Sequence, residues 1–183
     1  VGCRALVDSG RRSSVMTLPT LSTERLTLRP HLLADYPAFR AFWMSDRAVH
    51  IGGPLKQDYE VWRQFAAEAG QWNLHGFGLW TVVSKAGDAV LGWVGLHHPP
   101  HYPAPECAWH LTADAEGRGI GSEAATAALA DGWNRLALPR IVSYVSAANH
   151  RSIRLAERLG ATVAERGSFG GTDYVLFDHP RAA

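Results

Sequence analysis

The chain has 183 residues, 46% of them hydrophobic and 19% charged, and a formal net charge of +1. This length suits one domain with a full core. The small charge argues against a protein that binds nucleic acid through a basic face, and no apolar run approaches the ~18 residues that a membrane span needs.

Cys3 and Cys107 are the two cysteines, and they lie far apart in the chain. A disulfide framework or a cysteine-based zinc site is therefore not expected, and a reducing, cytoplasmic compartment is the default. Residues 1–15 show little hydrophobic periodicity and lack the apolar core of a secretion signal. We predict that residues 1–15 are a disordered N-terminal extension and that residues 16–183 form a single domain.

Hydrophobic periodicity predicts a mixed α/β order of elements. The N-terminal half is expected to contain a strand at 23–29, helices at 34–45 and 59–72, and a hairpin of strands at 78–83 and 89–96. The C-terminal half is expected to contain a strand at 106–111, a helix ending near 138, a strand at 140–146, a short helix at 152–159 and a hairpin at 162–166 and 173–177. In the second helix, Trp62, Phe65 and Ala69 are predicted to face inward.

Residues 116–122 form a glycine-rich stretch, Glu-Gly-Arg-Gly-Ile-Gly-Ser, between a predicted strand and an alanine-rich helix. Glycines at alternate positions permit positive φ and expose backbone N–H groups, and the helix directs its positive dipole end at the same place. This pattern predicts a phosphate cradle; the simpler alternative is an ordinary glycine-rich connection.

The residues around the glycines exclude two nucleotide-binding interpretations of this stretch. A P-loop requires a lysine after the last glycine, and none follows Gly121. A dinucleotide fingerprint requires a tight strand-to-helix turn and an acidic residue about 20 positions on. Here several residues separate the strand from the glycines, and the next strand ends without a carboxylate.

The stretch resembles the coenzyme A pyrophosphate loop of the GNAT acetyltransferases, whose pattern is Gln/Arg-x-x-Gly-x-Gly/Ala at a helix start. Gly119 and Gly121 match, and Arg118 stands where basic or polar residues are usual. Glu116 departs from the pattern, because it holds the position normally filled by Gln or Arg.

The order of the predicted elements from residue 21 to residue 179 is also similar to the GNAT order. The opening Glu-Arg-Leu-Thr-Leu-Arg-Pro at 24–30 and the strand Leu-Gly-Trp-Val-Gly-Leu at 91–96 resemble the ribosomal-protein N-terminal acetyltransferase branch. The resemblance implies the GNAT fold: an α/β structure with a mixed, mostly antiparallel central sheet of about seven strands, flanked by about four helices. It also implies a V-shaped splay between the fourth and fifth strands.

Acetyl-CoA is the implied cosubstrate, and no metal is expected. By the resemblance, the backbone of the fourth strand grips the acetyl carbonyl and the pantetheine amides, and the glycine-rich stretch holds the diphosphate. The implied cofactor-binding residues of these two segments are Trp109, His110, Leu111, Gly117, Arg118, Gly119, Ile120, Gly121 and Ser122.

The segment from Asn149 to Gly160 is the second informative motif. Asn149 or Ser152 is suited to cap a short helix, and both also match the GNAT segment Asn-x-x-Ser/Ala, where the Asn contacts the pantetheine arm or holds the cofactor-side loop. Family members that donate a proton from tyrosine carry it four residues after the Ser/Ala position. Ala156 stands there, so Ser152, or a water that it holds, becomes the candidate that hydrogen-bonds the departing thiolate.

Glu106 and His110 are the candidate bases. Strand alternation predicts that both side chains lie on one face, with Cys107, Trp109 and Leu111 on the other. Glu106 corresponds to an acidic position common in this branch, where it positions an amine or accepts its proton through water. The structural alternatives are a carboxylate paired with an arginine and a histidine with a packing role.

His97, His98 and His101 crowd a proline-rich loop. They lack acidic or cysteine companions at fixed spacing, so a metal site is not expected. Instead, we expect these histidines to line the substrate site.

The resulting interpretation is an N-acetyltransferase that moves the acetyl group of acetyl-CoA to a primary amine by direct attack in a ternary complex, with Glu106 and Ser152 as catalytic residues. The acceptor is a small-molecule or peptide amine, protein N-termini included. A non-catalytic acetyl-CoA-binding module and an enzyme for another acyl group remain alternatives. We expect a monomer or homodimer with neither nucleic acid nor a membrane as partner.

Overall fold

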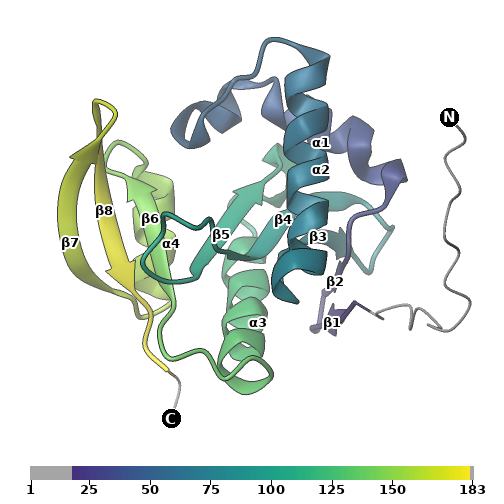
Figure 1. Cartoon of the computed structure of the whole chain (residues 1–183). Helices are drawn as coiled ribbons and strands as arrows, with labels where there is room; N and C mark the ends of the chain where they lie inside the picture. Colours follow the sequence, from purple (N-terminus) through teal and green to yellow (C-terminus); the bar gives the residue numbers. More distant parts are fainter. Residues whose placement is uncertain (1–17, 182–183) are drawn as a thin grey trace, which may run out of the picture.

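The computed structural model describes residues 18–181, so the extension expected at 1–15 lies outside the described residues. One mixed sheet of eight strands, in the order β1-β2-β3-β4-β5-β6-β8-β7, forms the centre of the molecule (Figure 1). The strands are β1 (Leu21–Ser22), β2 (Leu26–Arg29), β3 (Leu79–Ser84), β4 (Val90–His97), β5 (Glu106–Leu111), β6 (Val142–Ser146), β7 (Thr162–Phe169) and β8 (Thr172–Asp178).

Four α-helices and three short 3-10 segments connect the strands. The helices are α1 (Tyr36–Trp43), α2 (Asp58–His75), α3 (Ile120–Asn134) and α4 (His150–Arg158), and the 3-10 segments are η1 (Leu33–Asp35), η2 (Asp46–Ile51) and η3 (Ala113–Ala115). The predicted α/β class and the mostly antiparallel sheet are confirmed. The eighth strand is the two-residue β1, which is too short for a periodicity argument to detect.

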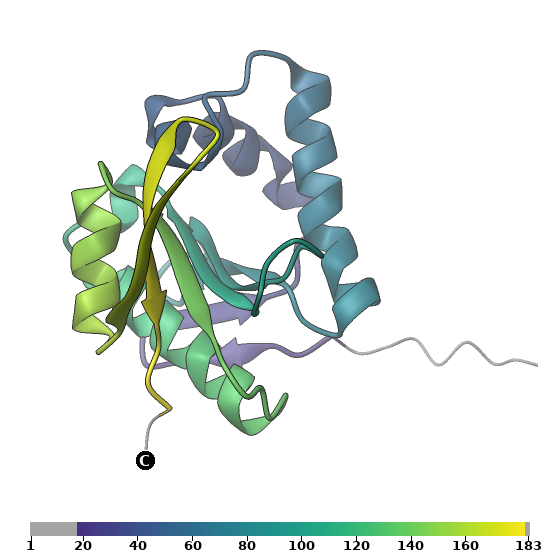
Figure 2. The same cartoon turned by 60° about the vertical axis from the view of Figure 1, so that its left-hand side comes forward.

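The helices cover both faces of the sheet, with α1 and α2 on one face and α3 and α4 on the other (Figure 2). On the α1–α2 face, Phe39 packs against both Phe65 of α2 and Trp93 of β4. On the other face, the fully buried Ala124 and Ala128 of α3 pack with Val94. Alanines on this side of α3 allow the helix to lie close to the strands.

The inward face of α2 differs from the predicted one. Val61, Phe65, Glu68 and Trp72 are buried, whereas Trp62 is 48% exposed. The prediction that Trp62 belongs to the core is therefore wrong. The predicted inner face of α2 is therefore rotated by about one residue from the observed one. The reason is that a buried glutamate, Glu68, interrupts the apolar stripe that would otherwise mark the inner face.

Strands β5 and β6 are parallel neighbours that separate almost at once. Their only paired position is Glu106 with Val142. Beyond it, two side chains link the strands: the Ser143 hydroxyl donates to the Cys107 carbonyl (2.6 Å), and the Tyr144 N–H donates to Glu106 Oε1 (2.9 Å). The V-shaped splay expected between the fourth and fifth of seven strands is thus present between β5 and β6.

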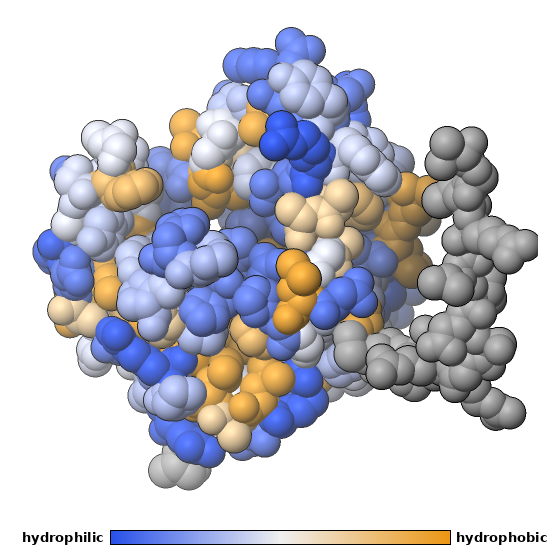
Figure 3. All heavy atoms as spheres, in the orientation of Figure 1, coloured by the Kyte–Doolittle hydropathy of each residue, from blue (hydrophilic) through white to orange (hydrophobic). Residues whose placement is uncertain are grey.

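On the face shown in Figure 3, apolar residues form separate patches among hydrophilic ones. No helix within residues 18–181 has the length and apolar character needed to cross a lipid bilayer.

Close packing of the sheet requires glycine in β4. A Cβ atom on Gly95 would collide with the Gly78 carbonyl oxygen and lie 2.7 Å from the Leu79 Cα, both backbone atoms that cannot move without disturbing β3. By contrast, a Cβ on Gly70 in α2 would have no atom within 4 Å.

We expect Gly95→Ala to lower the free energy of unfolding by about 2 kcal/mol or more, because overpacking displaces backbone. Gly70→Ala is the matched control and should raise it by about 0.5–1 kcal/mol, since alanine is the better helix former. Urea denaturation measures both. Equal shifts in the two variants would show that the sheet does not require glycine at position 95.

Candidate active site

Two cavities meet where β5 and β6 part. The glycine-loop cavity, of about 880 Å³, is lined by the loop at 116–122 and by α4. The tyrosine cavity, of about 830 Å³, is lined by Tyr102, Tyr144 and Tyr174. Both are lined by the same six residues, namely His50, Ile51, Trp109, His110, Asn149 and Ser152. The two spaces are therefore joined along these residues.

The loop at 116–122 presents a row of free backbone donors. Gly117 and Gly119 have φ values of 71° and 74°, and Gly119 is the N-cap of α3. Among the described residues, no backbone or side-chain group accepts a hydrogen bond from the N–H groups of 117–122. These donors lie at the positive end of the α3 dipole, an arrangement that suits a diphosphate.

Arg25, from the opening motif, supports this loop from behind. Its guanidinium donates to the Arg118 carbonyl oxygen (2.9 Å) and to Glu123 Oε2 (2.6 Å). Burial raises the pKa of Glu123, but hydrogen bonds from Thr23 and Arg25 outweigh it and lower that pKa. The β1–β2 segment thus holds the loop and the first turn of α3 in place.

Two of the predicted cofactor-binding residues have other contacts. The Arg118 guanidinium donates to the Asp114 carbonyl (3.0 Å), and Arg118 does not line the glycine-loop cavity. A Cβ on Gly121 would lie 2.7 Å from Leu111 Cδ1 and 3.1 Å from Leu155 Cδ2. Glycine at 121 therefore allows α3 to approach β5 and α4, while its backbone still lines the cavity.

Glu116, which departs from the family pattern, bridges two arginines. Its carboxylate lies 3.1 Å from an amino nitrogen of Arg47 and 3.0 Å from one of Arg151. Arg47 also donates from Nε to the Leu111 carbonyl (2.9 Å). Together with Arg154 and Arg158, these guanidinium groups line the same cavity as the free amides. Glu116 thus holds the guanidinium groups of Arg47 and Arg151 in place beside a site that is suited to an anion.

Trp109, Ser152 and Asn149 form a hydrogen-bonded group at the junction of the cavities. Ser152 Oγ accepts from Trp109 Nε1 (3.1 Å), and Asn149 Oδ1 accepts from the Ser152 N–H (3.2 Å), which confirms Asn149 as the helix cap. Because Ser152 Oγ is an acceptor toward Trp109, its own proton remains available to another group. Ala156, at the position of the family's tyrosine, is fully buried.

Glu106 is buried between the parting strands, with 9% of its surface exposed. Within residues 18–181 it forms no ion pair, so the alternative of a structural pair with arginine does not apply. Burial raises the pKa of Glu106 to about 8, and the hydrogen bond from Tyr144 offsets this only in part. The carboxyl group therefore changes its protonation close to neutral pH.

His110 lies on the same face of β5 as Glu106, as the alternation predicted: Ala108 packs with the α1–α2 cluster and Cys107 with the α3 cluster. The imidazole ring stacks on Phe42 (5.9 Å) and contacts Trp43 edge-on (5.6 Å). Burial lowers the pKa of His110, which favours the neutral ring. Its Nδ1 has no hydrogen-bond partner among the described residues.

The histidine loop contributes to the tyrosine cavity through His97 and His101. His97 Nδ1 lies 2.6 Å from the Gln71 amide nitrogen, and His98 Nε2 lies 3.3 Å from the Tyr102 carbonyl oxygen. In the part of the chain that the structure describes, no group of three or more His, Cys, Asp or Glu residues could hold a metal ion.

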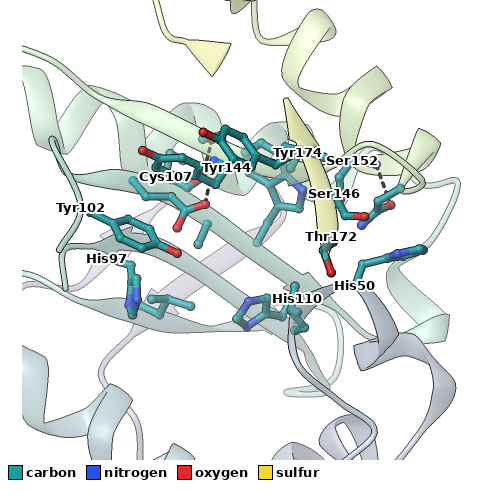
Figure 4. Close-up of a pocket in the computed structure, with 18 of the residues that line it drawn as sticks. His50, His97, Tyr102, Cys107, His110, Tyr144, Ser146, Ser152, Thr172 and Tyr174 are labelled. Carbon is teal, nitrogen blue, oxygen red and sulfur yellow. Dashed lines mark hydrogen bonds between the residues drawn. The ribbon is translucent and has the colours of Figure 1, made fainter. Parts of the chain in front are cut away.

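Sequence reasoning missed the aromatic wall of the tyrosine cavity. Tyr102 and Tyr144 have ring centroids 4.8 Å apart, and Tyr144 and Tyr174 5.4 Å apart. Figure 4 shows His97 and Tyr102 at one end of this cavity and Ser152 and His50 at the other. The three tyrosines come from a loop, β6 and β8, so no local sequence pattern relates them.

Comparisons with known proteins agree with this geometry. Residues 25–162 match the family model of the acetyltransferase (GNAT) domain. An acetyltransferase of known structure from Agrobacterium tumefaciens strain C58 is 35% identical, and the match covers 94% of this chain and 100% of that chain with a TM-score of 0.83.

Two ribosomal-protein acetyltransferases share the fold at lower identity. The ribosomal-protein-S5-alanine acetyltransferase from Vibrio fischeri is 18% identical over 87% of this chain and 95% of that chain (TM-score 0.70). RimL, a ribosomal L7/L12 alpha-N-protein acetyltransferase solved with coenzyme A, is 16% identical over 88% of this chain and 97% of that chain (TM-score 0.73).

The fold and these matches define the protein as an acetyltransferase. The chain belongs to the GNAT family, whose members use acetyl-CoA.

The raised pKa of Glu106 predicts a pH-dependent stability. Between the ordinary glutamate pKa of 4.5 and about 8, the unfolded chain has released this proton while the folded chain retains it, so Glu106 makes stability fall as pH rises. In Glu106→Gln this contribution is absent. We expect the free energy of unfolding of the variant, relative to the natural protein, to increase from pH 5 to 8 and then level off.

Urea denaturation from pH 5 to 8 measures the difference in free energy of unfolding between Glu106→Gln and the natural protein. Glu157→Gln, at an exposed position, is the control for the general loss of a carboxylate. A difference that is constant with pH would contradict the buried, protonated state of Glu106.

Proposed function

We propose that this acetyltransferase moves the acetyl group of acetyl-CoA to a primary amine by direct attack within a ternary complex. The observation that carries the proposal is the junction of the two cavities at the parted strands. An anion-binding cavity and a cavity with buried carboxylates meet at Trp109 and Ser152. This arrangement suits two substrates that approach one reaction centre from different sides.

The glycine-loop cavity fits the cofactor's phosphates. The free N–H groups of 117–122 and the guanidinium groups of Arg47 and Arg151 would hold the diphosphate. Beyond Glu106, the edge of β5 toward β6 has no strand partner. The backbone of 109–111 along this edge would hold the pantetheine arm. When bound, acetyl-CoA supplies the activated acetyl thioester.

Glu106 is suited to accept the amine proton, and Ser152 is suited to stabilise the departing thiolate. The amine nitrogen forms a bond to the acetyl carbon, the carbon–sulfur bond breaks, and one proton leaves nitrogen while the thiolate gains one. Glu106, once ionised, accepts the amine proton directly or through water, and neutral His110 on the same face is a second acceptor. The Ser152 hydroxyl, oriented by Trp109, donates a hydrogen bond that stabilises the departing thiolate, and the thiolate takes up its proton from solvent.

The names of two fold neighbours favour protein N-termini among the acceptors, since those proteins act on ribosomal proteins S5 and L7/L12. Trp109, held by its hydrogen bond to Ser152, favours a small acyl group at the junction.

Ser122→Glu tests the cofactor site without disturbing the fold. An added carboxylate in the first turn of α3 should weaken coenzyme A binding by about tenfold or more, equivalent to about 1.4 kcal/mol, through repulsion of the diphosphate. Calorimetry measures the affinity. The thermal midpoint should not fall, because acidic residues suit a helix N-terminus.

Ser122→Gln has nearly the same size without the charge and is the matched control. If both variants bind coenzyme A as the natural protein does, the loop at 117–122 is not the diphosphate site.

Glu106→Gln tests the base. We expect kcat/KM of the natural protein to rise as pH increases through about 8, because the ionised carboxylate is the active form. The variant should lose about 100-fold in kcat and lack this rise. Coenzyme A affinity should be unchanged. Steady-state rates from pH 6 to 9 decide the matter, and an identical pH profile in the two proteins would remove Glu106 from the mechanism.

A further inference from the structure

Helix α4 carries a stripe of arginines along the glycine-loop cavity. Arg151, Arg154 and Arg158 are spaced by three and four residues, so they fall on one side of the helix. Leu155 belongs to the same side, and a Cβ atom on Gly121 would lie 3.1 Å from its Cδ2. This side of α4 therefore faces the first turn of α3, and all three arginines line the cavity there.

Arg154 and Arg158 differ from Arg151 in having no anionic partner. Arg151 pairs with Glu116 at 3.0 Å, whereas within residues 18–181 neither Arg154 nor Arg158 forms a salt bridge. Both are exposed, and they stand four residues apart. Like charges at this spacing destabilise a helix. An anion bound by both guanidinium groups would relieve their repulsion.

The order of residues along α4 places these two arginines away from the reaction centre. Asn149 and Ser152, at the N-terminal end of α4, line both cavities and mark their junction. Arg151 is held beside the glycine loop by Glu116. Arg158 stands about 10 Å further along the helix axis and lines the glycine-loop cavity but not the tyrosine cavity. The cavity thus continues along α4 beyond the loop.

Coenzyme A has a further anionic group that matches this part of the cavity. Its diphosphate joins the pantetheine arm to a ribose, and the ribose carries a separate 3′-phosphate. A phosphate monoester has a charge of about −1.5 to −2 at neutral pH. Guanidinium groups bind phosphate oxygens through pairs of parallel hydrogen bonds. With the thioester at Ser152 and the diphosphate at the glycine loop, the remaining phosphate would lie on the side of Arg154 and Arg158.

We propose that Arg154 and Arg158 form a subsite for the 3′-phosphate of the cofactor. The subsite depends on the proposed function, because it requires the diphosphate at the glycine loop. It gives the protein a selectivity for coenzyme A over 3′-dephospho-coenzyme A. Arg151 does not belong to the subsite, since Glu116 holds it beside the loop.

Coenzyme A and 3′-dephospho-coenzyme A differ only in this phosphate, so their affinities test the subsite directly. By calorimetry, we expect the natural protein to bind coenzyme A about tenfold more tightly, equivalent to about 1.4 kcal/mol. The ratio should shrink at high salt, because the two arginines are exposed. Equal affinities for the two ligands at low salt would overturn the proposal.

Arg154→Gln and Arg158→Gln should weaken coenzyme A binding and leave 3′-dephospho-coenzyme A binding unchanged. The double variant should bind the two ligands equally. Arg158 is in the last turn of α4, where a cation also suits the helix dipole, so its replacement can lower stability. Arg154→Gln tests the subsite without this effect. A double variant that keeps the tenfold preference would show that these arginines do not bind the 3′-phosphate.

Two control variants separate the subsite from other effects of charge. Arg151→Gln should weaken both ligands alike, because both contain the diphosphate. Arg63→Gln removes an exposed arginine from α2, on the opposite face of the sheet, and should change neither affinity (Figure 2). If Arg63→Gln reduced the preference as much as Arg154→Gln does, general attraction by the positive protein would explain it, and the subsite would be rejected.

Failure of the proposed function would look different from failure of the subsite. If the glycine loop does not hold the diphosphate, neither ligand should bind to the natural protein, and the cofactor site and the subsite are both rejected. If both ligands bind with equal affinity, the diphosphate site stands and the 3′-phosphate subsite alone is overturned.

Discussion

The separation of β5 from β6 is the constraint on which the site depends. Two parallel strands in one sheet normally pair along their length, because unpaired backbone groups in the interior are costly. Here the strand pairing ends after one position, and side chains form the remaining hydrogen bonds between the strands. The Glu106 carboxylate accepts from the Tyr144 N–H, and the Ser143 hydroxyl donates to the Cys107 carbonyl. The opening this creates is where the two cavities join. Glu106 thus helps to form the opening and also lies within it.

The charges of the site are divided between its two cavities. Arginines and free amides surround the glycine loop, while buried carboxylates and aromatic rings surround the other cavity. The arginines and free amides favour an anionic ligand in the glycine-loop cavity, whereas no arginine or lysine within residues 18–181 lines the other cavity. Glu116 fits this arrangement, because its carboxylate holds Arg47 and Arg151 beside the loop rather than acting as a ligand itself.

Local features of the site could be predicted because their causes are local. The glycine stretch turns with positive φ at Gly117 and Gly119, and Asn149 caps α4, each through contacts within a few residues. The rotation of α2 was mispredicted at Trp62, because Glu68 stands in the buried stripe where an apolar residue was assumed. A charged residue spaced among Val61, Phe65 and Trp72 was a signal that could have identified it.

The sequence by itself therefore determined the order of the elements, the turn of the glycine-rich loop at 116–122 and the alternation of side chains along β5. These follow from backbone preferences and from the two periodicities of strands and helices. Only the tertiary structure decided which distant residues lie together: Arg25 behind the loop, Glu116 between two arginines, and tyrosines from three segments around one cavity. The raised pKa of Glu106 likewise follows from its burial between β5 and β6, strands that are distant in the sequence, so no single stretch of sequence predicts it.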